Sequence, residues 1–180
     1  MLCCVQGMFT VASVVFFRAA NVGGFRVFRP AVLANDLAEM DVVNIGAAGT
    51  FVVRTSASAK EIASAIAARV PFEPDLMICG APAVLALAET EVFAGAPEGA
   101  DRMLTVTRGK PTKAPRLPIE KQADHWQVRL LAVTGPFVLS LRRPRQPGIY
   151  PNPVVEKEFG VPATTRKWST VAAIVRALGS

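Results

Sequence analysis

The chain is poor in the side chains that most often carry metal-dependent or redox chemistry. It contains one histidine and three cysteines in 180 residues; Cys3 and Cys4 are adjacent, and Cys79 stands alone in an apolar run. Neither residue type has the spacing of a zinc site or of a redox motif. We therefore expect no metal and no cofactor, and the odd cysteine count favours a cytoplasmic location.

Groups for acid–base catalysis are equally scarce. His125 lies between Asp124 and Trp126 with no candidate nucleophile to activate, so we interpret it as the start of a strand. Glu156 and Glu158 are two residues apart and would point to different faces of a helix, so they do not form a catalytic pair. No set of residues in the sequence requires a particular reaction.

Long apolar runs are also missing. The N-terminal run from Met8 to Phe17 is shorter than the ~20 residues that a membrane-spanning helix needs, and no Lys or Arg precedes it as in an export signal. We interpret it as a buried strand that follows an N-terminal extension, residues 1–8. No membrane partner is expected.

The chain is rich in apolar residues, and its charged residues are unevenly distributed along the sequence. It is 51% hydrophobic and 19% charged, a composition typical of a globular protein with a sizeable core. Residues 1–100 carry a net charge of −3, and residues 101–180 carry +9. The basic half suggests an anionic partner, either nucleic acid, a phosphate-bearing ligand or an acidic surface; alternatively it is a solvated basic face.

The first half, residues 9–90, predicts the order β-α-β-β-α-β. Ser58 and Glu61 form a capping box that opens the second helix, and Gly46 to Gly49 is typical of a hairpin turn. This is the split order of a ferredoxin-like unit. The expected elements are strands over 10–17, 41–45, 50–54 and 74–79, and helices from Pro30 and from Ser58.

A further helix near Pro82–Glu89 and a linker, residues 91–101, lead to the second half, residues 102–180. Three prolines in residues 109–118 predict an extended basic loop where the first half has a helix. Strands are expected over 103–107, 126–133 and 137–141, then a helix with Asn152 as N-cap, Pro153 in its first turn and Gly160 after its end, and a last helix from about Ser169. We therefore predict an α+β fold of two ferredoxin-like halves, the second degenerate, packed as one compact unit.

Two ordered motifs resemble a known family. Residues 160–171, with the sequence GVPATTRKWSTV, are similar to the closing motif of the bacterial proteins grouped as domain of unknown function 1697, and Asn152 with residues 155–157 is similar to the helix before it. Arg18, Asn21, Gly23 and Gly24 match that family's arginine–glycine loop. The resemblance implies an α+β fold with duplicated halves and no established activity. The chain departs from the family's usual pattern at Lys167, where Asn is usual, and at residues 46–49.

The first candidate site is the loop that carries Arg18, Asn21, Gly23 and Gly24. Backbone N–H groups of such a loop can cradle a phosphate, and an arginine can add a bidentate contact. The alternative is a tight turn in which Arg18 bridges the two halves.

The second candidate site is the segment that precedes the last helix. Its hydroxyls would lie at a helix start beside two cations and an aromatic ring, an arrangement that can bind a phosphate or a base. Alternatively, Thr165 or Ser169 caps the helix and Trp168 packs between the halves. The residues are Thr164, Thr165, Arg166, Lys167 and Trp168.

These sites lead to one preferred hypothesis and several alternatives. We expect a non-catalytic protein that binds a phosphate, nucleotide or nucleic acid, with Arg18 and Arg166 meeting in one crevice. The alternatives are an enzyme that uses Thr164 or Thr165 on a phosphorylated or acyl substrate, and a structural homodimer formed through sheet edges or Trp168. Residues 153–178 also resemble a helix-turn-helix unit, and the basic tip 142–145 could extend the positive face.

Overall fold

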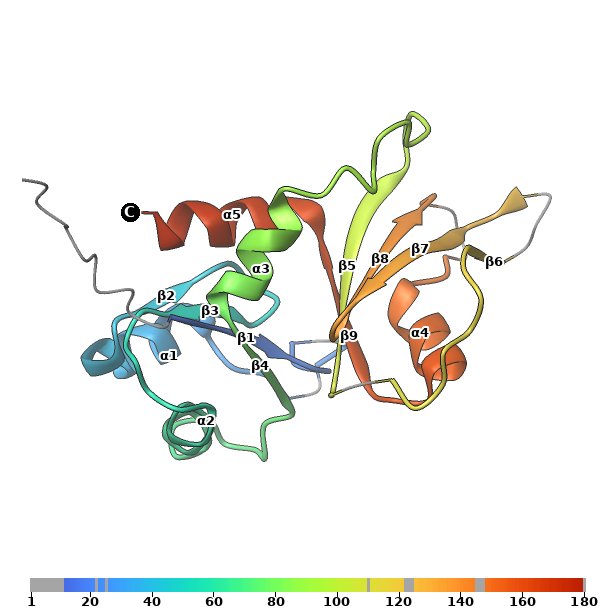
Figure 1. The fold of residues 1–180 in the computed structure, drawn as a ribbon. Helices are drawn as coiled ribbons and strands as arrows, with labels where there is room; N and C mark the ends of the chain where they lie inside the picture. Colours follow the sequence, from blue (N-terminus) through green and yellow to red (C-terminus); the bar gives the residue numbers. More distant parts are fainter. Residues whose placement is uncertain are drawn as a thin grey trace, which may run out of the picture.

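The protein is α+β, with two antiparallel sheets and five α-helices in its described part (Figure 1). The computed structural model describes residues 12–21, 23–24, 26–109, 111–121, 125–144 and 148–179. The expected N-terminal extension, residues 1–8, and the discussed residues Asp124 and Arg145 lie outside this part.

The first sheet has four strands in the order β2-β3-β1-β4, and all neighbours are antiparallel. Every residue of β1 is buried, as its apolar, β-branched sequence predicts. The Ser58–Glu61 capping box is confirmed, since the Ser58 hydroxyl accepts from the Glu61 N–H and the Glu61 carboxylate accepts from the Ser58 N–H. The elements are β1 (Ser13–Phe17), α1 (Pro30–Asp36), a short 3₁₀ helix (Ala38–Met40), β2 (Val42–Asn44), β3 (Thr50–Val53), α2 (Ala59–Ala67), β4 (Leu76–Gly80) and α3 (Ala81–Ala88).

The second sheet has five antiparallel strands in the order β6-β7-β8-β5-β9. Apart from the short β6, its strands follow the same order as those of the first sheet, with β5 in the place of β1. The described residues of the range 108–118, all but Lys110, contain no helix or strand, as the prolines predict. The elements are β5 (Asp101–Thr107), β6 (Ile119–Lys121), β7 (Val128–Thr134), β8 (Phe137–Arg142), α4 (Pro151–Phe159), β9 (Ala163–Lys167) and α5 (Trp168–Leu178).

Two expectations for the second half are wrong, and the helix-turn-helix alternative is not supported. The segment with Thr164 and Thr165 is strand β9 and not a helix start, because β5 is buried and its second edge needs a hydrogen-bonding partner. This strand also separates α4 from α5, so the two helices do not form a helix-turn-helix unit. The N-cap of α4 is Tyr150 and not Asn152, because Pro151 supplies the preset φ of the first turn.

The core has three layers. The outer face of the first sheet packs under α1 and α2 through Phe17, Leu33 and Ile66. The outer face of the second sheet packs under α4 through Val155 and Phe159. Between them lies a central core to which both sheets, α3 and α5 contribute.

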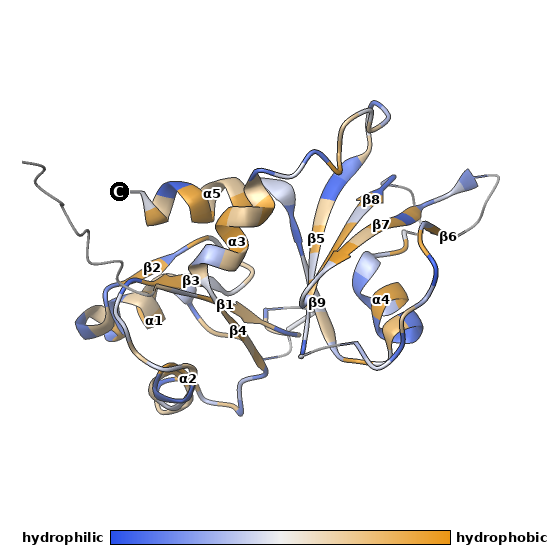
Figure 2. Cartoon of the chain, viewed as in Figure 1, coloured by the Kyte–Doolittle hydropathy of each residue, from blue (hydrophilic) through white to orange (hydrophobic). Residues whose placement is uncertain are grey.

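Helix α5 belongs to the second half by sequence but packs against β3 of the first sheet, beside α3 (Figure 1). The apolar residues concentrate in the first sheet and α3, and polar residues lie at the outer end of β5 (Figure 2). In the described part of the chain, no helix has the length and apolar character that a membrane span requires.

Candidate functional site: a crevice between the two halves

A cavity of about 730 Å³ lies where the end of β1 meets β9 and the first turn of α4. Four of the predicted site residues line it: Arg18, Thr164, Thr165 and Arg166. Arg18 is 146 or more residues from the other three in sequence, and they share one crevice because β1 and β9 belong to different sheets that meet here. The other lining residues are Phe17, Ala19, Ala20, Ala48, Tyr150, Asn152, Pro153 and Ala163.

The guanidinium of Arg166 is buried in the wall of this crevice, with 7% of the residue exposed. Its Nε donates to Thr50 Oγ1 at 2.7 Å, and its Nη1 donates to Thr164 Oγ1 at 2.9 Å and to the Thr165 carbonyl at 3.0 Å. Desolvation lowers the pKa of Arg166 to about 10, so the group stays charged at neutral pH.

The remaining donor of Arg166, Nη2, points into the first half of the protein. It donates to the carbonyls of Phe17 at 2.7 Å, Ala48 at 2.8 Å and Gly49 at 3.3 Å. All of these partners are neutral, and among the described residues no carboxylate pairs with Arg166. The crevice therefore contains a positive charge that is not neutralised locally.

Arg18 is bound to two carboxylates. Its Nε and Nη2 donate to Glu156 Oε1 at 3.0 and 2.8 Å, and its Nη1 donates to Asp75 Oδ2 at 3.2 Å. The hydrogen bond to Glu156 is the largest of the effects that raise the pKa of Arg18. Because Glu156 is on α4 and also accepts from the Ala163 N–H at 2.8 Å, Arg18 bridges the two halves.

The two threonines adopt different roles from those expected. Thr164 donates to the Phe17 carbonyl at 3.2 Å and accepts from Arg166. Thr165 shares a hydrogen bond of 2.8 Å with Thr105 of the neighbouring strand. Neither hydroxyl caps α5, whose N-cap residue is Lys167 and whose first turn receives no side-chain capping hydrogen bond.

The glycine loop after β1 does not belong to the crevice beyond Arg18 and the two alanines that follow it. Asn21 fastens this loop, since its Nδ2 donates to the Ala47 carbonyl at 3.1 Å and its Oδ1 accepts from the Phe28 N–H at 2.9 Å. Gly23 and Gly24 have φ values of +57° and +78°, which a turn requires. The expected phosphate cradle at Asn21, Gly23 and Gly24 is thus separate from Arg166 and serves as a turn.

Lys167 and Trp168 also lie outside the crevice. Lys167 is exposed and pairs with Asp101, Nζ to Oδ1 at 3.3 Å. Trp168 packs edge-on against Phe93 at 4.9 Å between ring centroids, at the edge of the central core. The predicted cluster of two cations and a ring therefore divides, because alternate strand residues face opposite sides and the helix begins at Trp168.

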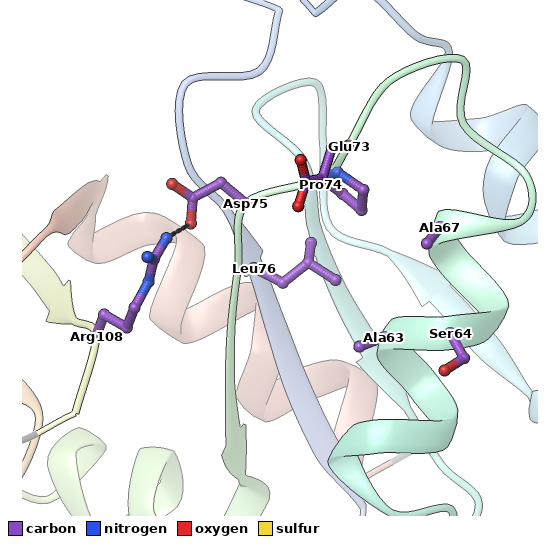
Figure 3. Close-up of a pocket in the computed structure, with 8 residues that line it drawn as sticks. All are labelled: Ala63, Ser64, Ala67, Glu73, Pro74, Asp75, Leu76 and Arg108. Carbon is purple, nitrogen blue, oxygen red and sulfur yellow. Dashed lines mark hydrogen bonds and ion pairs between the residues drawn. The ribbon is translucent and has the colours of Figure 1, made fainter.

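A second arginine is equivalent to Arg18 in the other half. The N–H groups of Phe17 and Arg18 donate to the carbonyls of Gly49 and Asp75, and those of Thr107 and Arg108 donate to the carbonyls of Pro136 and Pro162, all at 2.8 Å. Each arginine thus follows the first strand of its half. Arg108 also forms an ion pair with Asp75, beside a pocket of about 500 Å³ walled by α2 (Figure 3).

Sequence reasoning missed Tyr150, Asp75 and Arg108, and it assigned Asn152 to a cap. A signal for Arg108 exists, since it occupies the same place after its strand as Arg18. The roles of Tyr150, Asp75 and Asn152 depend on contacts between the two halves, and no local sequence pattern indicates such contacts.

Comparison with known proteins supports the architecture. No family model and no curated protein matches the chain. A solved structure of a conserved bacterial protein from Streptococcus pneumoniae is similar, with a TM-score of 0.62 and 14% sequence identity over 94% of this chain and 99% of that one. At this identity the likeness concerns the fold alone.

Proposed function

We propose that the protein binds a small phosphate-bearing anion in the crevice, without covalent chemistry. The observation that carries this proposal is the buried charge of Arg166, whose partners are all neutral, in the wall of a cavity of about 730 Å³. A positive charge in a desolvated site attracts an anion more strongly than one in water. The cavity volume is within the range of about 300–1,000 Å³ that small-molecule sites occupy.

The balance of charge supports an anion rather than a cation. Arg18 belongs to an ion-pair network with Asp75, Arg108 and Glu156, in which two positive and two negative groups offset each other. Arg166 then leaves one positive charge in excess. Asn152 and Pro153, in the first turn of α4, line the same cavity, so the positive end of the helix dipole adds to the field.

The direct contacts would come from groups that still have hydrogen-bonding capacity. A guanidinium has five N–H donors, and Arg18 uses three of them in its bonds to Glu156 and Asp75. The Thr165 hydroxyl completes the contacts to the phosphate, and the Asn152 amide can contact another part of the ligand. Arg166 holds the wall in place, because all three of its nitrogens already donate to protein oxygens.

An enzymatic role for the threonines is less well supported. It would need a base near Thr164 or Thr165, and the partners of their hydroxyls among the described residues are Phe17, Arg166 and Thr105.

We also propose that each half is a ferredoxin-like unit and that the chain is a relative of domain of unknown function 1697. The matching strand orders support the first proposal, and the two sequence motifs support the second.

The experiment is a calorimetric titration with inorganic phosphate at low salt, comparing Arg18→Ala with Arg108→Ala. Both variants lose one positive charge and one ion pair to Asp75, but only Arg18 lines the crevice. We expect Arg18→Ala to raise the Kd for phosphate by about 10- to 150-fold, since a charge-assisted hydrogen bond contributes about 1.5–3 kcal/mol. Arg108→Ala should change the Kd by less than about twofold. Equal effects of the two substitutions, or no binding by the unmodified protein, would refute the proposal.

A further inference from the structure

One end of the crevice is formed by an aromatic ring. Tyr150 precedes α4 and lines the cavity, and 51% of the residue is exposed. The guanidinium of Arg142 lies over the ring, 4.0 Å from its centroid. Arg142 is itself buried and held by the Ile149 carbonyl at 3.0 Å and by Asp101 at 3.4 Å. Arg142 therefore covers one face of the ring, while about half of the residue stays exposed.

Many of the residues that line the cavity have small, apolar side chains. Ala19, Ala20, Ala48 and Ala163 contribute only methyl groups to the lining, and Pro153 contributes its ring. Such walls leave room for a flat group and offer it no hydrogen bonds. A planar, largely apolar moiety therefore fits this region better than a sugar or a second charged group.

The cavity lining also includes an amide that has no hydrogen-bond partner in the described part of the chain. Asn152 is two residues after Tyr150 and lines the cavity, and its side chain has no hydrogen bond within the described part of the chain. An amide offers both donors and an acceptor, the pattern that pairs with the edge of a nucleobase. A simple aromatic acid would leave this group unused.

We infer that the anion is a nucleoside monophosphate, with its base stacked on Tyr150 and paired with Asn152, and its phosphate directed to Arg18 and Thr165. This inference depends on the proposed function, because it assigns the phosphate to the same crevice. The cavity of about 730 Å³ has the size of a small-molecule pocket and suits one nucleotide rather than a polymer.

The test compares AMP, ribose 5-phosphate and adenosine by calorimetry. AMP should bind about tenfold more tightly than ribose 5-phosphate, the ratio that corresponds to about 1.4 kcal/mol of base stacking. Tyr150→Ala should remove that ratio and leave the Kd for ribose 5-phosphate unchanged. Tyr150→Phe keeps the ring and should retain the ratio, which makes it the matched control. Circular dichroism of both variants establishes that they are folded.

The outcomes separate this inference from the proposed function. Equal affinities for AMP and ribose 5-phosphate would overturn the nucleotide assignment and leave phosphate binding in place. An AMP preference that survives Tyr150→Ala would overturn the stacking role. Adenosine binding as tightly as AMP, or no binding of any of the three, would overturn the proposed function and the inference with it.

Discussion

At the scale of single residues, the unusual group is a buried guanidinium whose donors are satisfied by neutral oxygens. Arg166 donates to six acceptors, of which four belong to the first half of the protein. A carbonyl or hydroxyl that loses such a donor in a buried site costs about 1–3 kcal/mol. Arg166 therefore links the two halves through hydrogen bonds and also gives the crevice a positive charge.

Arg166→Lys should show this structural role. Lysine keeps the charge but has three donors on one atom, so it cannot reach acceptors arranged around a planar fork. We expect the free energy of unfolding to fall by about 2–4 kcal/mol, measured by urea denaturation. Arg102→Lys is the control, because Arg102 is exposed and only its stacking on the Phe93 ring, at 6.0 Å, is affected. Similar losses in both variants would contradict the role given to Arg166.

The sequence singles out Arg18 and Arg166, but it does not reveal their surroundings. Thr164 and Thr165 before a helix are compatible with two structures, since hydroxyls favour caps while β-branched side chains favour strands. The choice depends on the open edge of β5, which is a tertiary feature. Tertiary pairing overrides local preference here.

At the scale of elements, the end of α4 connects the basic loop to the second sheet. Gly160 is the residue after this helix, as predicted, and has a φ of +70°. The Phe159 carbonyl accepts from both the N–H and the hydroxyl of Thr112, at 3.1 and 3.0 Å. A Cβ built on Gly160 would lie 2.5 Å from Thr112 Oγ1. The helix end therefore tolerates no side chain there unless Thr112 moves.

Comparison of Gly160→Ala with Gly99→Ala isolates this contact. Both glycines have positive φ, +70° and +74°, so each substitution costs about 1–2 kcal/mol of backbone strain. Nothing lies within 4 Å of a Cβ on Gly99. We expect Gly160→Ala to lose about 1–3 kcal/mol more than Gly99→Ala in thermal or urea unfolding, because of the clash. Equal losses would show that Thr112 moves freely.

The boundaries of elements show where local patterns stop being sufficient. The capping box of α2 and the glycine after α4 are specific signals, and both are confirmed. Pro151 and Pro153 fit the first turn of a helix equally well, so the start of α4 is ambiguous in the sequence. Strand β6 has only three residues, too few for a periodic pattern.

At the scale of the whole molecule, the halves are joined by more than a linker. The central core takes residues from both sheets, and α5 crosses to cover the first sheet. The ion pair of Arg18 with Glu156 and the hydrogen bonds of Arg166 to the first half both cross this boundary, one from each side. The strands of the first sheet lie within residues 13–80 and those of the second within residues 101–167. The charge asymmetry of the sequence gives no sign of the contacts between them.

These shared contacts predict that the halves unfold together. Ile66 is 1% exposed and packs in the outer core of the first sheet, which contains residues of the first half only. Both tryptophans, Trp126 and Trp168, belong to the second half. Ile66→Val should destabilise the protein by about 1 kcal/mol, which lowers the urea midpoint by about 0.5 M for an m-value of about 2 kcal/mol/M.

If the halves form one cooperative unit, tryptophan fluorescence and circular dichroism will report the same shift, although the substitution touches no residue of the second half. Val32→Ala is the control, because Val32 lies on the first-half helix α1 with 47% of its surface exposed, and its truncation should leave the midpoint nearly unchanged. A fluorescence midpoint that stays in place while the circular dichroism transition splits in two would mean that the halves unfold separately. The crevice would then depend on a docking equilibrium, because its two walls come from different halves, and the affinity for phosphate would fall by the fraction of molecules that are undocked.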